Sequence, residues 1–124
     1  MQALGLSYQV VCLSSQDMGK KAALTYDCET WMAAREGYGE THSNSLVLDF
    51  QTRRLKIKYR DKQSLPSKDG KDGQIKYCHA LNNTAIASPR ILIALLENFQ
   101  KEDGTVVIPE VLQKYTGFSE IKPK

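Results

Sequence analysis

The positions of apolar and polar residues along the chain predict a series of short β-strands. Between Leu55 and Tyr59 every second residue is apolar, and Lys56 and Lys58 fill the positions between them. Because successive side chains of a strand point to opposite faces, this period of two predicts a half-buried antiparallel strand. Segments rich in β-branched, aromatic and other apolar residues predict further strands at 8–13, 26–32, 46–50, 74–79 and 105–108.

Helix signals occur both early and late in the chain. Ser14 and Asp17 have the spacing of a capping box, which predicts a helix that runs on to Leu24. Ser88 followed by Pro89 is typical of an N-cap residue and a first helical position. Apolar residues then recur at helical spacing and predict a buried stripe made of Ile91, Leu92, Leu95, Leu96 and Phe99.

Two polar stretches between these elements predict loops. Residues 35–44 contain two glycines and many polar groups. Residues 61–73 contain Pro66 and two Asp-Gly steps, and they predict a loop that joins the strands on either side as a hairpin.

Together these elements predict an α+β fold, with antiparallel strands and helices on one side. A last helix begins at Pro109, and the residues after Gly117 predict a tail. The predicted domain therefore covers residues 1–117, and the tail covers 118–124. Large apolar side chains are assigned to its core, among them Trp31, Leu95 and Phe99.

Composition places the chain among soluble globular proteins. Of its 124 residues, 41% are hydrophobic and 25% are charged, and no apolar run reaches the roughly 20 residues that a bilayer requires. We therefore expect no membrane partner.

The net charge of +3 is weakly basic, with much of the excess at 53–62. This basic stretch is either a solvated strand face or, as an alternative, a small nucleic-acid module using Lys56, Lys58 and Arg60. The aromatic residues are not interleaved with these cations in the sequence, which favours the solvated face.

The cysteines indicate neither a disulfide framework nor a zinc site. Cys12, Cys28 and Cys78 are odd in number and widely spaced, which fits a reducing compartment. Cys78 and His79 are adjacent, and no second ligand pair stands at the usual interval.

Ordered motifs carry the sequence further than its periodicity does. They read Asp-Cys-Glu-Thr-Trp-Met at 27–32, Glu-Thr-His-Ser at 40–43, Asp-Phe-Gln-Thr-Arg-Arg-Leu at 49–55, and His-Ala-Leu-Asn-Asn-Thr-Ala at 79–85, which leads to Pro89-Arg90. In this order and spacing they resemble the seryl-tRNA synthetases, a family of class II aminoacyl-tRNA synthetases. Residues 95–112 are similar to the helix and closing segment of the same family.

The resemblance implies the C-terminal part of a class II catalytic domain, an antiparallel sheet with flanking helices whose third motif lies around residues 80–100. It implies an enzyme that activates serine with ATP to seryl-adenylate and then transfers the seryl group to serine tRNA. The implied partners are serine, serine tRNA and a second copy in a homodimer. The chain lacks the family's coiled-coil arm and its first and second motifs, so we expect the segment alone to be inactive.

The resemblance also implies roles for five residues. Glu40 and Ser43 would hold Mg²⁺ and ATP, since a carboxylate and a hydroxyl are oxygen ligands suited to this ion. Arg90 would contact the γ-phosphate end of ATP. A cation is poorly placed at the positive end of a helix unless an anion lies there, which favours this role. Asn82 and Thr84 would line the serine pocket, because alternate residues of a strand face one way. Catalytic roles are thus predicted for Arg90 and Glu40.

Departures from the family pattern leave a second hypothesis open. Ser45-Leu46-Val47-Leu48 replaces the family's Ser-Asn-Cys-Thr, and Ala80 stands where a threonine is usual. These changes allow a non-catalytic synthetase-like paralogue that acts as a binding or scaffolding protein. The Ser88-Pro89-Arg90 and 99–101 segments are similar to the bacterial and mitochondrial branch. This similarity predicts the mitochondrial matrix, with the cytoplasm as the alternative.

Overall fold

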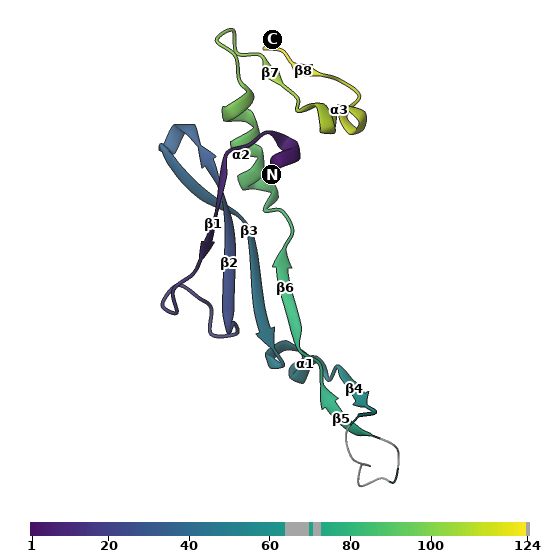
Figure 1. Cartoon of the computed structure of the whole chain (residues 1–124). Coiled ribbons are helices and arrows are strands. Elements are labelled where there is room, and N and C mark those ends of the chain that lie inside the picture. The colour runs from purple at the N-terminus through teal and green to yellow at the C-terminus, as the bar shows by residue number, and fades with distance from the viewer. Residues whose placement is uncertain (64–69, 71–72, 124) are drawn as a thin grey trace. The chain divides into compact units, whose positions relative to one another are not determined.

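The computed structural model describes residues 1–63, 70 and 73–123, which fall into two compact units. Unit 1 contains Met1–Val11, Asp27–Ser43 and Thr84–Lys124, and unit 2 contains Cys12–Tyr26 and Asn44–Asn83. A four-stranded sheet has the order β1-β2-β3-β6, formed by β1 (Tyr8–Cys12), β2 (Leu24–Met32), β3 (Gly37–Leu48) and β6 (Ala80–Thr84) (Figure 1). Helices accompany this sheet, so the predicted α+β class is confirmed.

β2 and β3 form a hairpin where the sequence predicts a loop at 35–44. They are joined by the 3-10 helix η2 (Ala33–Arg35), and Glu36 turns the chain with a φ of 48°. The loop prediction is therefore wrong, and one of its two glycines, Gly39, serves close packing. A Cβ on Gly39 would lie 2.9 Å from the Cε of Met32, so the bare backbone leaves room for that side chain.

The buried face of this hairpin includes several polar side chains. Thr25 and Ser45 share a hydroxyl hydrogen bond of 2.9 Å, and Thr30 and Thr41 share one of 2.8 Å. All four side chains are buried, so each hydroxyl satisfies another that water does not reach. These cross-strand pairs follow the order of antiparallel neighbours.

The apolar core of unit 1 lies where α2 (Ser88–Phe99) packs beside β2. It consists of Leu6, Met32, Ile91 and Ala94, with Met1, Leu4, Leu95 and Phe99 packed against it. The predicted stripe is therefore too wide, because Leu92 is 55% exposed and Leu96 is 46% exposed. Trp31 is only half-buried and contacts the ring of Tyr38 edge-on at 5.3 Å, so its assignment to the core is wrong.

In unit 2 the predicted helix after Ser14 does not form. The Ser14 hydroxyl donates to Asp17 Oδ2 at 2.9 Å, and the N–H of Met18 bonds back to the Ser14 carbonyl at 3.1 Å. This closes one turn, and Gly19 follows it. Turns and bends then continue to β2, because the segment has no apolar stripe that packing could stabilise.

The predicted strand at Leu55–Tyr59 is right only for Lys58 and Tyr59. Residues Phe50–Leu55 form the helix α1, and Lys56 ends it with a φ of 57°. The strand β4 begins later, at Lys58–Asp61, and pairs antiparallel with β5 (Gln74–Tyr77). The predicted hairpin is thus confirmed, although much of its loop, including Pro66, lies outside the described residues.

The predicted tail contains structure as well. Glu120–Ile121 form β8, which pairs antiparallel with β7 (Val106–Val107) on either side of α3 (Glu110–Thr116). The sequence did not predict this strand because two residues are too few to show an alternation of apolar and polar positions.

Across the described residues, no helix combines the length and the apolar character needed to cross a membrane.

We predict that Thr41→Val lowers the free energy of unfolding by about 1–3 kcal/mol, because it leaves the buried Thr30 hydroxyl unpaired. Adding Thr30→Val should cost no more, since the orphaned hydroxyl is then removed. Denaturation in urea measures both effects, and the exposed Thr84→Val is a control that should stay within about 0.5 kcal/mol. Additive losses in the double variant would contradict the pairing.

Candidate functional site

Two residues predicted to act on ATP and Mg²⁺ contact each other directly. Glu40 lies on β3, Arg90 lies in the first turn of α2, and the Arg90 Nη1 is 3.0 Å from the Glu40 Oε2. The two side chains are 35% and 45% exposed, so solvent reaches both charges. The pair therefore presents one anionic and one cationic group side by side at an accessible position in unit 1.

The start of α2 is held against β3 by a backbone hydrogen bond. The N–H of Ala87 donates to the carbonyl of Thr41 at 2.8 Å, and the N–H of Ile91 donates to the Ala87 carbonyl at 3.0 Å. Thr41 follows Glu40 directly, and Ala87 precedes Arg90 by one helical turn. This bond fixes the separation of the two charged residues.

The N-cap of α2 is Ala87, and Ser88 is already helical, so the predicted cap is shifted by one residue. No side chain caps this end. The N–H groups of the first turn lack intrahelical partners, and Pro89 contributes none. These groups leave a partial positive charge beside Arg90.

A group of hydroxyls stiffens the strand beside Glu40. The Thr41 hydroxyl donates to the Cys28 carbonyl at 3.1 Å and also contacts Thr30 Oγ1 and, at 3.0 Å, the Nδ1 of His42. Because Thr41 has a single hydroxyl proton, the Thr30 hydroxyl donates to it. The residue after Glu40 on this strand is therefore held in place by the hydrogen bonds of its hydroxyl, and this fixes the backbone position of Glu40.

The other predicted site residues are less closely tied to this pair. Ser43 lies on β3, three residues after Glu40. Residues three apart on a strand point to opposite faces. The spacing would have suited one shared ion in the predicted loop, but it does not favour a shared ion in this strand. Asn82 and Thr84 lie two apart on β6, and both are exposed. Neither side chain makes a hydrogen bond within the described part of the chain. The proposed roles of these three residues remain predictions.

Sequence reasoning missed a hollow that adjoins Arg90. It has a volume of about 320 Å³ and is lined by Met32, Ala34, Arg35, Arg90, Ile93 and Glu97. The Glu97 carboxylate accepts a hydrogen bond from the Ala34 N–H at 3.1 Å, which ties α2 to η2. No sequence signal locates this hollow, because it forms where a turn and a helix distant in the chain meet.

Among the described residues, no group of three His, Cys, Asp or Glu side chains could enclose a metal ion. A single carboxylate such as Glu40 is nevertheless a usual protein ligand for Mg²⁺, which keeps several waters and takes its other oxygens from substrate phosphates. The residues present therefore fit a metal that arrives together with a polyphosphate.

Burial shifts the pKa of two groups near this strand. The pKa of the His42 imidazole is lowered, mainly by burial and secondarily by the positive charge of the amino terminus. The pKa of the Cys28 thiol is raised, also mainly by burial. His42 is therefore neutral near pH 7, and Cys28 is a thiol with little nucleophilic character.

Comparisons with known proteins agree with this fold. No protein-family model matches the chain. The chain is 50% identical over 116 residues to the serine–tRNA ligase of Cenarchaeum symbiosum, covering 94% of this chain and 26% of that protein. It is 48% identical over 123 residues to the serine–tRNA ligase of Dictyoglomus thermophilum, covering 99% of this chain and 27% of that protein.

A solved structure gives the same result. The seryl-tRNA synthetase from Pyrococcus horikoshii, complexed with ATP, superposes with a TM-score of 0.87 at 46% identity, and the match covers 99% of this chain and 26% of that one. The proteins matched here are thus aminoacyl-tRNA synthetases. More particularly, the chain is homologous to a segment of the seryl-tRNA synthetases, or serine–tRNA ligases. It spans about a quarter of their length.

We predict that the stability of unit 1 falls in acid through His42. A histidine whose pKa is lowered by folding binds protons more tightly when unfolded. Its contribution is therefore present above the ordinary pKa of about 6.5 and is lost as the pH falls through the lower folded value. Denaturation midpoints between pH 8 and pH 5 should show this loss in the wild type and less of it in His42→Gln. The exposed His79→Gln serves as the control, and an unchanged slope in His42→Gln would reject the idea.

Proposed function

We propose that this chain is part of a class II serine–tRNA ligase that activates serine with ATP and Mg²⁺ and then charges serine tRNA. The observation that carries the proposal is the contact between Glu40 and Arg90 at the start of α2. It is supported by the 50% identity to a serine–tRNA ligase over 94% of the chain and by the likeness to a relative solved with ATP.

The chemistry of the pair suits a metal-bound nucleotide. Mg²⁺ on a triphosphate is itself a cation joined to an anion, so it offers a counter-charge to each member of the pair at once. Glu40 would bind on the metal side, and Arg90 would hold phosphate oxygens with its planar fork of donors. Exposed ion pairs contribute at most about 1 kcal/mol, so exchanging this one for the nucleotide costs little.

The position of Arg90 adds to its preference for an anion. The uncapped first turn of α2 presents backbone N–H groups and the positive end of the helix dipole. Arg90 and these groups would together stabilise the charge that develops as pyrophosphate leaves. We infer that Arg90 acts mainly in the transition state and that Glu40 acts mainly through the metal.

Asn82 and Thr84 are proposed to bind serine. Both are exposed on β6, and each carries a polar group that can hydrogen-bond the hydroxyl of serine. Amide and hydroxyl groups that hydrogen-bond a substrate hydroxyl discriminate strongly against an analogue without it, such as alanine. Ser43 is proposed as a further oxygen near the metal, with a smaller contribution than Glu40.

A non-catalytic paralogue is the second candidate. It is favoured by the apolar run Leu46–Leu48 and by Ala80, which depart from the family pattern on strands β3 and β6. Serine-dependent exchange of pyrophosphate into ATP distinguishes the two, because a scaffolding protein would have none. The homodimer and the mitochondrial location are also proposals, which cross-linking of the complete protein and fluorescence microscopy of a tagged copy would test.

In the complete ligase, Arg90→Ala should lower ATP–pyrophosphate exchange by at least about tenfold. Charge-assisted hydrogen bonds contribute about 1.5–3 kcal/mol, and about 1.4 kcal/mol is one decade in rate. Arg90→Lys should recover part of the loss, because a point charge lacks the fork. Lys114→Ala, on α3, is the control. An exchange rate within about twofold of the wild type would exclude Arg90 from the reaction.

Glu40→Gln should raise the Mg²⁺ concentration needed for half-maximal exchange, because it keeps the size of the side chain and removes its charge. Ser43→Ala should have a smaller effect on the same titration. The melting temperature is the control for both, since an exposed ion pair contributes little to stability. A Glu40→Gln enzyme with the wild-type Mg²⁺ dependence would eliminate the metal role.

A further inference from the structure

The two units carry opposite net charges. Unit 2 holds eleven lysines and arginines against five acidic residues, whereas unit 1 holds six against nine. The modest net charge of +3 therefore conceals a basic unit whose composition favours an anionic partner. The Glu40–Arg90 pair lies in unit 1, so the basic unit has a charge that this pair does not explain.

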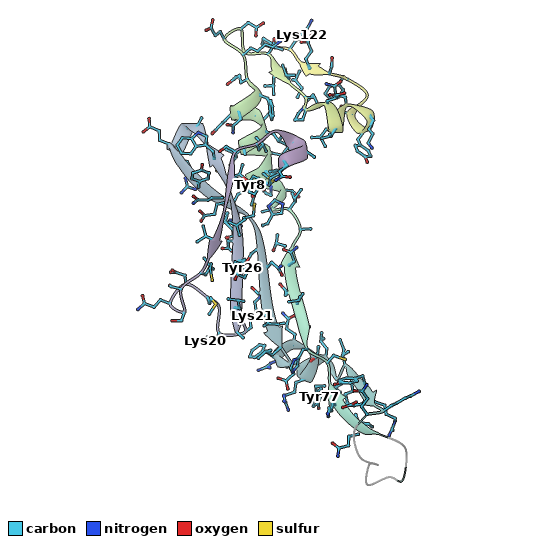
Figure 2. The ribbon with its side chains drawn as sticks, in the orientation of Figure 1. Tyr8, Lys20, Lys21, Tyr26, Tyr77 and Lys122 are labelled. Carbon is cyan, nitrogen blue, oxygen red and sulfur yellow. The ribbon has the colours of Figure 1, made fainter. Side chains whose placement is uncertain are left out.

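Folding brings these cations onto aromatic rings. The Arg53 guanidinium lies over the Tyr77 ring at 4.8 Å, and the Lys58 ammonium lies 5.1 Å from the same ring. Arg54 lies over Phe50 at 3.7 Å. Tyr77 lies on the β4–β5 hairpin (Figure 2). The sequence suggested that aromatic residues and cations were not interleaved. In the folded hairpin, however, cations lie next to aromatic rings.

The strand register explains the interleaving. Lys58 pairs with Tyr77, and Tyr59 pairs with Lys76, so each tyrosine stands directly opposite a lysine. Cross-strand partners lie within about 5.5 Å at Cβ, close enough for one ligand to contact both. Tyr59 remains 47% exposed, which leaves its ring available.

Several of these side chains line a pocket in unit 2. Its volume is about 690 Å³, within the usual size range of ligand sites, and its lining includes Arg53, Tyr59, Lys76, Tyr77 and His79. Arg53 also bonds Asp49, and Lys76 bonds Asp61 at 2.6 Å. Both cations are about half exposed, so phosphate oxygens can compete for them at little cost.

We propose that this pocket binds a single-stranded segment of RNA, with a base stacked on Tyr59 and its phosphates on Arg53 and Lys76. Aromatic rings beside cations form the stacking platform of single-strand binders, and a duplex hides the base faces that they need. The proposal rests on the proposed function only in taking this RNA to be part of the serine tRNA substrate.

The direct test is fluorescence anisotropy of the 124-residue chain with a labelled oligouridine of about eight nucleotides, within the usual range of site sizes. Arg53→Gln and Lys76→Gln should each weaken binding and lower the salt dependence of log K by about 0.7, the value for one phosphate contact on a single strand. Lys101→Gln, in unit 1, is the matched charge control. Equal weakening by Lys101→Gln would overturn the proposal.

Stacking is tested at Tyr59. Tyr59→Leu should weaken binding by about five- to a hundredfold without changing the salt dependence, whereas Tyr59→Phe, which keeps the ring, should bind like the wild type. Circular dichroism checks that both variants fold. Equal losses in the two variants would overturn the proposal, as would equally tight binding of an RNA duplex or of a polyglutamate peptide.

A second assay separates this site from the proposed ligase activity. In the complete enzyme, Tyr59→Leu should raise the KM for serine tRNA and leave ATP–pyrophosphate exchange unchanged. If exchange occurs and charging is insensitive to Tyr59→Leu, the proposed RNA site is wrong and the ligase function still stands. If the wild type shows no serine-dependent exchange, the ligase function fails, and the RNA site is judged by the anisotropy measurement.

Discussion

The hydrogen bond from the Ala87 N–H to the Thr41 carbonyl is the contact on which the candidate site depends. Glu40 and Arg90 are 50 residues apart in the sequence. Glu40 directly precedes the residue that accepts this bond, and Arg90 lies one helical turn after the residue that donates it. Two long, exposed side chains cost entropy to hold in one geometry, and this bond holds their backbones at a fixed separation. A backbone constraint therefore supplies the precision that the charges themselves do not.

Hydrogen bonds between buried hydroxyls also help to hold the strand that accepts this backbone bond. The buried side chains of β2 and β3 include Thr25, Thr30, Thr41 and Ser45, and their hydroxyls satisfy one another across the two strands. Paired polar groups of this kind are costly to break singly, because each leaves an unsatisfied partner. They therefore fix the register of β3, and with it the position of Glu40 opposite the start of α2.

The two units divide the chemistry of the chain. Unit 1 holds the Glu40–Arg90 pair and an acidic balance, and unit 2 holds the cations and tyrosines of the β4–β5 hairpin. A nucleotide-activating site and an RNA contact would suit a ligase that must handle two different anions. Separate placement of their ligands would let one be altered without the other.

The sequence alone was enough to predict several local elements and the resemblance to seryl-tRNA synthetases. Pro89 marked the start of α2, the polar stretch at 61–73 predicted a hairpin, and ordered motifs indicated the family of relatives that the comparisons found. These features were readable because each depends on a few neighbouring residues. Tertiary structure decided the rest: Gly39 made a strand of a predicted loop by admitting Met32, and the stripe on α2 narrowed because Leu92 and Leu96 face solvent. The approach of Arg90 to Glu40 and the register of Tyr77 with Lys58 depend on contacts between distant segments, which no local pattern encodes.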